Sequence, residues 1–147
     1  METLPFEIGE TAHALRRAFD RRAADLAVTR AQWKVMFRLD RKPGMRQVDL
    51  ADSLDVEPIT LCRIVDRLEE SGLVERRRDP GDRRAWQLYL TEQAGPMTAT
   101  LRGLGNDLIA DAFAGIDPND IATLRRVLDQ VRSNLANLPS VNRASNQ

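Results

Sequence analysis

A change of hydrophobic period in the middle of the chain most constrains its fold. Leu61, Val65 and Leu68 recur at three- or four-residue steps, which is the spacing of one helix face. After Gly72 the period shortens to two over residues 73–90, a pattern typical of a hairpin, with a turn at 79–82. The chain must therefore fold with a helix that leads directly into a two-stranded hairpin.

A second, shorter helix is predicted just before this one. The tripeptide 55–57 indicates a tight turn between them, and Pro58 suits a first helical position. Ser71-Gly72 is typical of a helix end. Short helix, tight turn, second helix and hairpin is the order of a winged helix-turn-helix. The apolar residues of the short helix are Val48, Leu50, Ala51 and Leu54.

Long amphipathic helices are predicted on both sides of this unit. Thr29 and Gln32 form a capping box at the start of one of them. Thr91 can cap the next helix, and Asp117 followed by proline starts the last. The resulting class is mainly α (α+β), a winged helix-turn-helix with N- and C-terminal helices. The flanking helices are predicted over residues 8–26, 29–41, 92–115 and 118–138.

Composition excludes several function classes. Cys62 cannot form an intramolecular bridge, and His13 alone cannot build a zinc site. We find no paired carboxylates, no nucleophile with a base and no cofactor loop, so we expect no enzyme activity, no metal and no cofactor. No apolar run approaches the ~18 residues that a membrane span needs, so we expect a cytoplasmic protein with no membrane partner.

Charge clustering points to a nucleic-acid partner, although the net charge is zero. Five arginines and only two aspartates fall within residues 76–84, at the predicted hairpin. Such a cluster can also be a merely solvated hairpin, but next to a helix pair it favours double-stranded DNA. On the second helix, Thr60 and Arg63 can reach base edges and Arg67 a phosphate. Pro58 and Ile59 can contact a thymine methyl group.

The segment LADSLDVEPITLCRIVDRLEESGLVERRRDPGDRRAWQLYLTEQA resembles the MarR family of bacterial transcription regulators, and more narrowly its SlyA-like branch. The resemblance covers nearly the whole chain. It implies that Arg84 enters the minor groove, that Asp82 orients it and that Arg83 makes a second contact. Arg76 matches a basic position on the first wing strand. The predicted DNA contacts are therefore Pro58, Ile59, Thr60, Arg63, Arg67, Arg76, Asp82, Arg83 and Arg84.

The resemblance also implies a homodimer that binds a pseudo-palindromic operator. Independently, the terminal helices carry more apolar surface than a small winged domain can cover, and dimerisation buries it. We therefore assign four parts to the chain. Residues 1–42 are dimerisation and scaffold helices, 43–91 the DNA-binding domain, 92–139 the C-terminal dimerisation helices and 140–147 a disordered tail.

A small-molecule effector is a further expectation from the resemblance, because family members often hold aromatic acids or phenolics. Trp33 and Met36 are more typical of a core, but a pocket there can draw on His13, Arg17, Trp33 and Met36. The predicted function is a repressor relieved by a small aromatic or phenolic acid. The alternatives are a winged-helix protein-interaction module and an activator that displaces another DNA-bound protein.

Two residues depart from the family pattern. Arg46 stands where a serine or threonine often caps the third helix, so that helix has to start differently. Cys62 lies beside the second helix of the pair, whereas peroxide-sensing relatives carry their thiol near the start of the first helix. We interpret Cys62 as a small packing residue, with oxidation that blocks DNA binding as the alternative.

Overall fold

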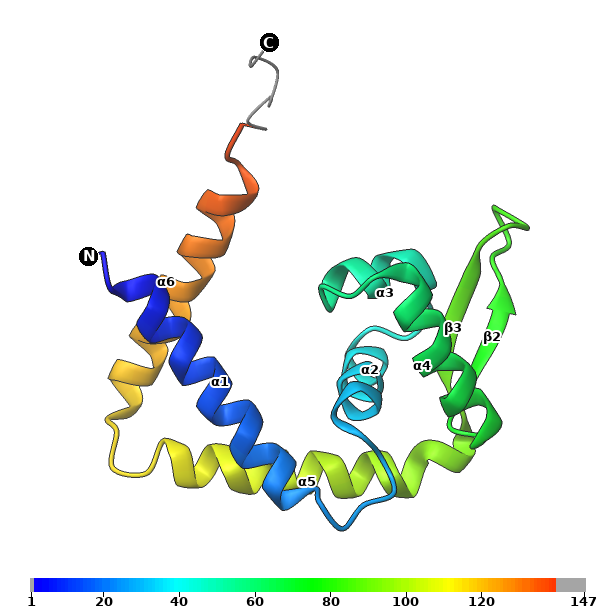
Figure 1. Ribbon diagram of the computed structural model, residues 1–147. Coiled ribbons are helices and arrows are strands. Elements are labelled where there is room, and N and C mark those ends of the chain that lie inside the picture. The colour runs from blue at the N-terminus through cyan, green and yellow to red at the C-terminus, as the bar shows by residue number, and fades with distance from the viewer. Residues whose placement is uncertain (1, 140–147) are drawn as a thin grey trace. The chain divides into compact units, whose positions relative to one another are not determined.

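The computed structural model describes residues 2–139, and the predicted tail at 140–147 lies outside the described residues. Its helices and short antiparallel sheet confirm the predicted winged helix-turn-helix (Figure 1). The elements in chain order are α1 (Leu4–Arg22), α2 (Arg30–Arg41), β1 (Met45–Arg46), α3 (Gln47–Ser53), α4 (Pro58–Glu70), β2 (Val74–Arg78), β3 (Trp86–Leu90), the 3-10 turn η1 (Glu92–Ala94), α5 (Gly95–Ala112) and α6 (Pro118–Ala136).

The chain divides into two compact units, Met1–Ile109 and Ala110–Gln147. The first contains all elements from α1 to η1 and most of α5, and the second contains the end of α5 and α6. The predicted division at residues 42, 91 and 139 concerns roles in dimerisation and DNA binding, and it stays a prediction.

Local signals account for most helix ends. The Thr29 hydroxyl accepts a hydrogen bond from the Gln32 backbone, and the Gln32 side chain accepts one from the Thr29 backbone, so the capping box that starts α2 is complete. Thr91 caps η1, and Asp117 caps α6 through the backbone N–H of Asn119. Asp55 adopts a positive φ of 53° in the turn between α3 and α4.

The sheet has the order β1-β3-β2, with both pairs antiparallel. The hairpin of β2 and β3 is the predicted wing. Strand β1 was not predicted, because two residues are too short to show a period. The register pairs Met45 with Leu88 and Val74 with Leu90, and it ends with Arg78 opposite Trp86.

The core of the first unit fixes the orientation of α4. Leu61, Val65 and Leu68 are fully buried, and α4 packs against α2, α3 and β2. The opposite face of α4 is therefore turned outward. The other large side chains that are fully buried are Val35, Met36, Leu39, Leu50, Val74, Leu88 and Leu101.

Helix α1 begins at Leu4 rather than at residue 8, and the predicted ends of α1 and α5 also differ from the structure. Helix α1 ends at Arg22, and Ala23 and Leu26 pack against the core from the turn that follows, so the apolar stripe outlasts the helix. Helix α5 ends at Ala112, because Gly115 adopts a φ of 79° in the turn before α6. The two errors at helix ends arise because apolar spacing alone does not distinguish a helix end from a turn packed on the same core.

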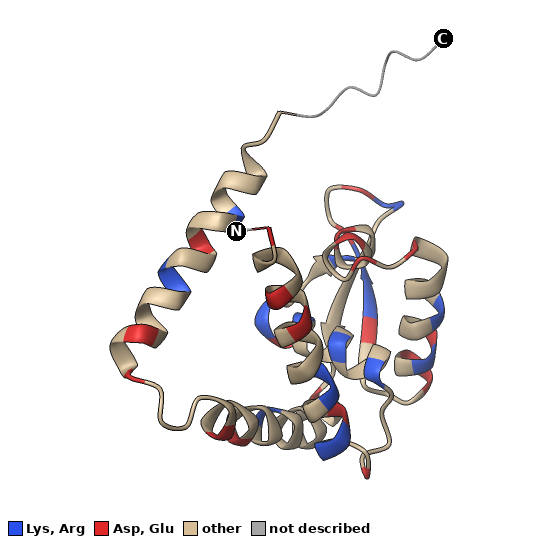
Figure 2. Cartoon of the chain, turned by 60° about the vertical axis from the view of Figure 1, so that its left-hand side comes forward, with Lys and Arg blue, Asp and Glu red and all other residues tan. Residues whose placement is uncertain are grey.

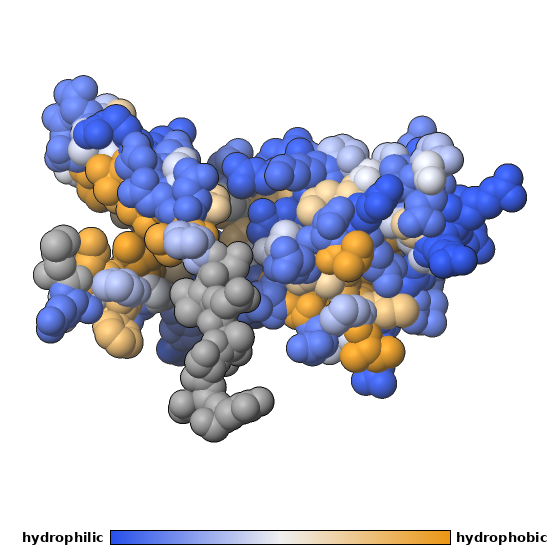
Figure 3. Space-filling view, turned by 90° about the horizontal axis from the view of Figure 1, so that it is seen from above, coloured by the Kyte–Doolittle hydropathy of each residue, from blue (hydrophilic) through white to orange (hydrophobic). Residues whose placement is uncertain are grey.

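Both units leave apolar side chains exposed, part of which is seen in orange in Figure 3. On α1, Phe6 is 75% exposed, and α6 contains no buried residue. Among residues 2–139, no helix is long and apolar enough to cross a membrane. The exposed apolar residues of α6 and its C-terminal end are Leu124, Val127, Val131, Leu135 and Leu138.

Candidate nucleic-acid interface

The outward face of α4 carries the residues predicted to read DNA. Ile59 is 63% exposed, and Thr60, Arg63 and Arg67 are exposed as well. Within the described residues neither arginine forms an ion pair, so both guanidinium groups are free to bind another molecule. Thr60, Arg63 and Arg67 line a groove of about 250 Å³ that also borders the start of α2.

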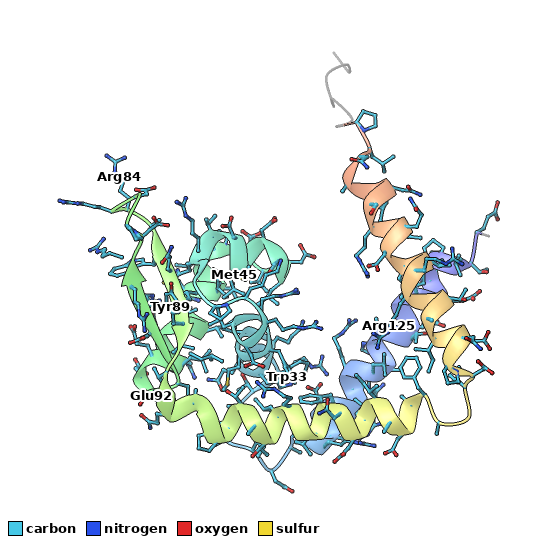
Figure 4. The ribbon with its side chains drawn as sticks, turned by 180° about the vertical axis from the view of Figure 1, so that it is seen from behind. Trp33, Met45, Arg84, Tyr89, Glu92 and Arg125 are labelled. Atoms are coloured by element: carbon cyan, nitrogen blue, oxygen red, sulfur yellow. The ribbon has the colours of Figure 1, made fainter. Side chains whose placement is uncertain are left out.

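The wing tip presents Arg83 and Arg84 to solvent. Figure 2 shows basic residues along β2 and in the loop beyond it, and Figure 4 shows Arg84 projecting away from the rest of the wing. The Asp82 carboxylate accepts a hydrogen bond of 3.0 Å from the Arg84 backbone N–H, which fixes the backbone of this loop. The Arg83 carbonyl oxygen accepts a hydrogen bond of 2.6 Å from Nη1 of Arg78.

The α4 residues and the wing residues meet at one groove. Pro58 from the start of α4 and Arg84 from the wing both line a hollow of about 290 Å³, together with Arg46, Val48 and Trp86. A convex helix beside a basic loop is the arrangement that places a helix in a major groove while a wing reaches the neighbouring backbone or minor groove.

A buried carboxylate, Asp79, organises the wing turn, and sequence reasoning identified it only as a turn residue. Its side chain is 6% exposed, and its Oδ1 accepts hydrogen bonds from the backbone N–H groups of Gly81 (2.7 Å) and Asp82 (3.2 Å). The Gly81 N–H lowers the pKa of Asp79, burial opposes this, and Arg46 lowers the pKa further. Asp79 therefore stays ionised at neutral pH.

Arg76 lies on the first wing strand, β2, as predicted, but its side chain bonds within the protein. Its side chain is 12% exposed, and its guanidinium donates to Asp66 (2.6 Å), Glu69 (2.9 Å) and Gln47 (3.1 Å). Burial lowers the pKa of Arg76, but its bonds to Asp66 and Glu69 more than compensate, so that pKa lies above its usual value. With its donors used inside the protein, Arg76 holds α3, α4 and β2 together and is not placed to contact DNA.

We predict that Arg76→Met lowers the free energy of unfolding by about 1–3 kcal/mol. A fully buried pair would cost more, but Asp66 and Glu69 are about half exposed, so water screens the charges left behind. The matched control is Arg77→Met, since Arg77 lies next to it on β2 but is exposed, stacks on Tyr89 and, among residues 2–139, forms an ion pair with Glu75 alone. Urea unfolding of both variants tests the difference, and equal losses would contradict a structural role for Arg76.

A cavity near the predicted effector residues lies between α1, α2 and α5 and has a volume of about 510 Å³. Its apolar wall includes Phe19, Trp33 and Phe37, whose rings pack against one another with centroids 4.5 to 5.6 Å apart. Its polar lining residues are Arg16, Asp40, Arg41, Arg102 and Asn106.

Of the four predicted effector residues, the cavity is lined by Trp33 alone. His13 and Arg17 are exposed on α1 and do not line the cavity, and Met36 is fully buried in the core. Arg16 takes the place expected for Arg17. The helical spacing favours Arg16 over Arg17 as a cavity residue, because Arg16 lies three residues before the buried Phe19 and so shares its helix face.

Trp33 is held in the cavity wall by a carboxylate on α1. Its indole Nε1–H donates to Oδ1 of Asp20 at 2.9 Å, and Arg30 pairs with the same carboxylate. Figure 4 shows Trp33 between α2 and α5. Burial raises the pKa of Asp20, but the bonds from Arg30 and Trp33 outweigh it, so that pKa lies below its usual value.

Comparisons with known proteins agree with this geometry. A family model described as MarR family matches residues 28–86. The crystal structure of transcriptional regulator PA3341 is 34% identical with a TM-score of 0.85, over 92% of this chain and 99% of that chain. Wild-type apo MarR from E. coli is 28% identical with a TM-score of 0.73, over 87% of this chain and 95% of that chain. The transcriptional regulator SlyA is 26% identical with a TM-score of 0.76, over 90% of this chain and 93% of that chain.

Proposed function

Because the chain belongs to the MarR family of transcription regulators, we propose that it is a homodimer that binds specific DNA sequences and represses transcription. The observation that carries this proposal is the groove that Pro58, at the start of α4, shares with Arg84 of the wing, while Arg63 is exposed further along α4. The narrower SlyA-like assignment stays a prediction from the sequence resemblance. A DNA target implies action in the cytoplasm.

The two arginines have different expected roles. With α4 in the major groove, Arg63 reaches a base edge, which specifies sequence, and Arg67 reaches a phosphate. Pro58 and Ile59 offer apolar contact to a thymine methyl group. The wing contributes Arg84 and Arg83 to the minor groove or its phosphates, contacts that add affinity across many sequences.

The test is titration of the purified protein against DNA upstream of its own gene, at two salt concentrations and with random duplex as competitor. We expect binding that resists the competitor and weakens with salt. If genomic selection also yields no preferred sequence, the protein-interaction module becomes the better hypothesis. Reporter transcription from a bound promoter then separates a repressor from an activator that displaces another DNA-bound protein.

The exposed apolar residues support a homodimer. Regulators of this family act as dimers, and α6 with its C-terminal end has an apolar stripe, Leu124 to Leu138, that no described residue of its own unit covers. Pairing with a second copy can bury such a stripe, because in a two-fold dimer the same surface of each subunit forms the interface. Two α4 helices related by this axis would read half-sites about one helical turn, ~34 Å, apart.

We also propose that the cavity of about 510 Å³ binds the effector, a small aromatic or phenolic acid. The aromatic wall of Phe19, Trp33 and Phe37 suits a planar ring, and the arginines suit a carboxylate. Arg16 is the strongest candidate, because it is half-buried and forms no ion pair within residues 2–139.

Arg16→Gln is expected to weaken binding of benzoate or salicylate about tenfold, the loss of one charged hydrogen bond. Arg17→Gln removes the same charge one residue away, outside the cavity lining, and should leave the affinity within about twofold. Quenching of Trp33 fluorescence measures the affinity of both variants. The chain has two tryptophans, so Trp86→Phe is introduced first to leave Trp33 as the one that emits. Equal effects of the two variants, or no saturable quenching, would contradict this effector site.

A further inference from the structure

Arg46 stands at the start of α3 but does not cap it. Its backbone has the extended conformation of an N-cap residue, and its side chain forms no bond to the helix. A serine or threonine here would stabilise α3 by capping it. Instead, Nε of Arg46 donates a hydrogen bond of 2.8 Å to Oδ2 of Asp79 in the wing.

This bond connects the helix-turn-helix to the turn that presents Arg84. Gly81, Asp82 and Gln87, the other residues with hydrogen bonds to the Asp79 carboxylate among the described residues, all belong to the hairpin. Arg46 is the partner that comes from outside it. Strand β1 pairs with β3 only at Leu88 and Gln87, further from the tip, so the loop beyond has no such backbone connection to β1.

We propose that Arg46 is a positioning residue that, through Asp79, fixes the wing tip relative to the start of α4. This inference rests on the proposed DNA-binding function. Arg46, Pro58 and Arg84 line the same groove of about 290 Å³, so the Arg46 side of the pair lies in the groove shared by the start of α4 and the wing.

The physical advantage is preorganisation. A two-stranded ribbon is marginally stable by itself, and a mobile wing must lose conformational freedom when it enters a groove. An ion pair formed in the free protein removes part of that loss before DNA arrives. The 6% exposure of Asp79 favours a fixed geometry, whereas Arg46 at 45% leaves part of its guanidinium in solvent.

A double-mutant cycle with Arg84 separates positioning from direct contact. We expect Arg46→Gln to weaken operator binding about tenfold, and by less than about twofold when Arg84 is already alanine, because the contact that it positions is then gone. Arg46→Lys, which keeps a charged donor, should restore most of the affinity. If Arg46 instead binds a phosphate itself, the losses of operator affinity caused by the Arg46 and Arg84 substitutions will multiply. Replacing Arg46 in the Arg84→Ala background will then also lower the slope of log affinity against log salt concentration by about one per wing. That result would overturn the inference.

Hydrogen exchange in the free protein tests the same pair without DNA. The amides of Gly81 and Asp82, both bonded to Asp79, should exchange faster in Arg46→Gln than in the wild type, while amides of α4 stay unchanged. Unchanged exchange at Gly81 and Asp82 would overturn the positioning role. If the wild type binds no duplex but exchange responds as expected, the proposed function fails while the ion pair's hold on the wing stands.

Discussion

Arg84→Ala is expected to weaken operator binding by about 30-fold or more. Each of the two wings in a dimer loses an arginine contact worth at least ~1 kcal/mol, and the losses add. Arg84 is exposed at the wing tip, and its backbone is fixed by Asp82, so the substitution removes a contact without disturbing the fold. Fluorescence anisotropy with labelled duplexes, at several salt concentrations, measures both the affinity and the salt slope.

The kind of loss in affinity distinguishes α4 from the wing, the two elements that we propose contact DNA. Arg84→Ala should weaken all sequences alike, whereas Arg63→Ala should cost ~1–3 kcal/mol mainly on the preferred operator, if Arg63 reads a base. Arg77→Ala is the control on the same hairpin, because its guanidinium stacks on Tyr89 and pairs with Glu75. If Arg77→Ala weakens DNA binding as much as Arg84→Ala does, only the net charge of the wing determines its contribution to affinity.

The second large effect is expected from charges placed on the apolar stripe of α6. Leu124→Glu combined with Val131→Glu should give a monomer, because a two-fold interface would bury four uncompensated carboxylates. Loss of the second half-site contact should then weaken operator binding by about 10²- to 10⁴-fold, the contribution of bivalency. Sedimentation velocity gives the oligomeric state, and titration of half and full operators gives the affinities.

Ser133→Glu supplies the control for this variant. Ser133 is exposed and lies on the opposite side of α6 from Val131, so it adds a charge to the same helix outside the stripe. It should remain dimeric with unchanged affinity. A double variant that stays dimeric would show that a different surface of the chain forms the interface.

The wing illustrates how far sequence patterns reach. The hairpin period, the turn at 79–82 and the basic residues predicted the element and its exposed tip, and the structure has all three. Patterns did not reveal that Arg76 is used inside the protein, because its partners Asp66 and Glu69 lie on another element. Arg76 and Arg84 are both arginines on one hairpin, and only their neighbours in space distinguish them.

The cavity shows a second kind of limit. Trp33 lines the cavity between α1, α2 and α5, but Arg17 was chosen where Arg16 lines that cavity. Adjacent helix positions differ by about 100° in direction, so a one-residue error moves a side chain off the relevant face. Arg102, which pairs with Asp40 across the cavity lining, gave no local signal because 62 residues separate the two.

The sequence by itself determined the helix pair, the wing, the helix caps and the exposed face of α4, because periodicity and capping are interactions between residues close along the chain. Only the tertiary structure decided which arginines remain free for DNA and which are bound internally. Those choices depend on partners such as Asp79 for Arg46, 33 residues apart, which come together only when the core packs α3 and α4 against the sheet.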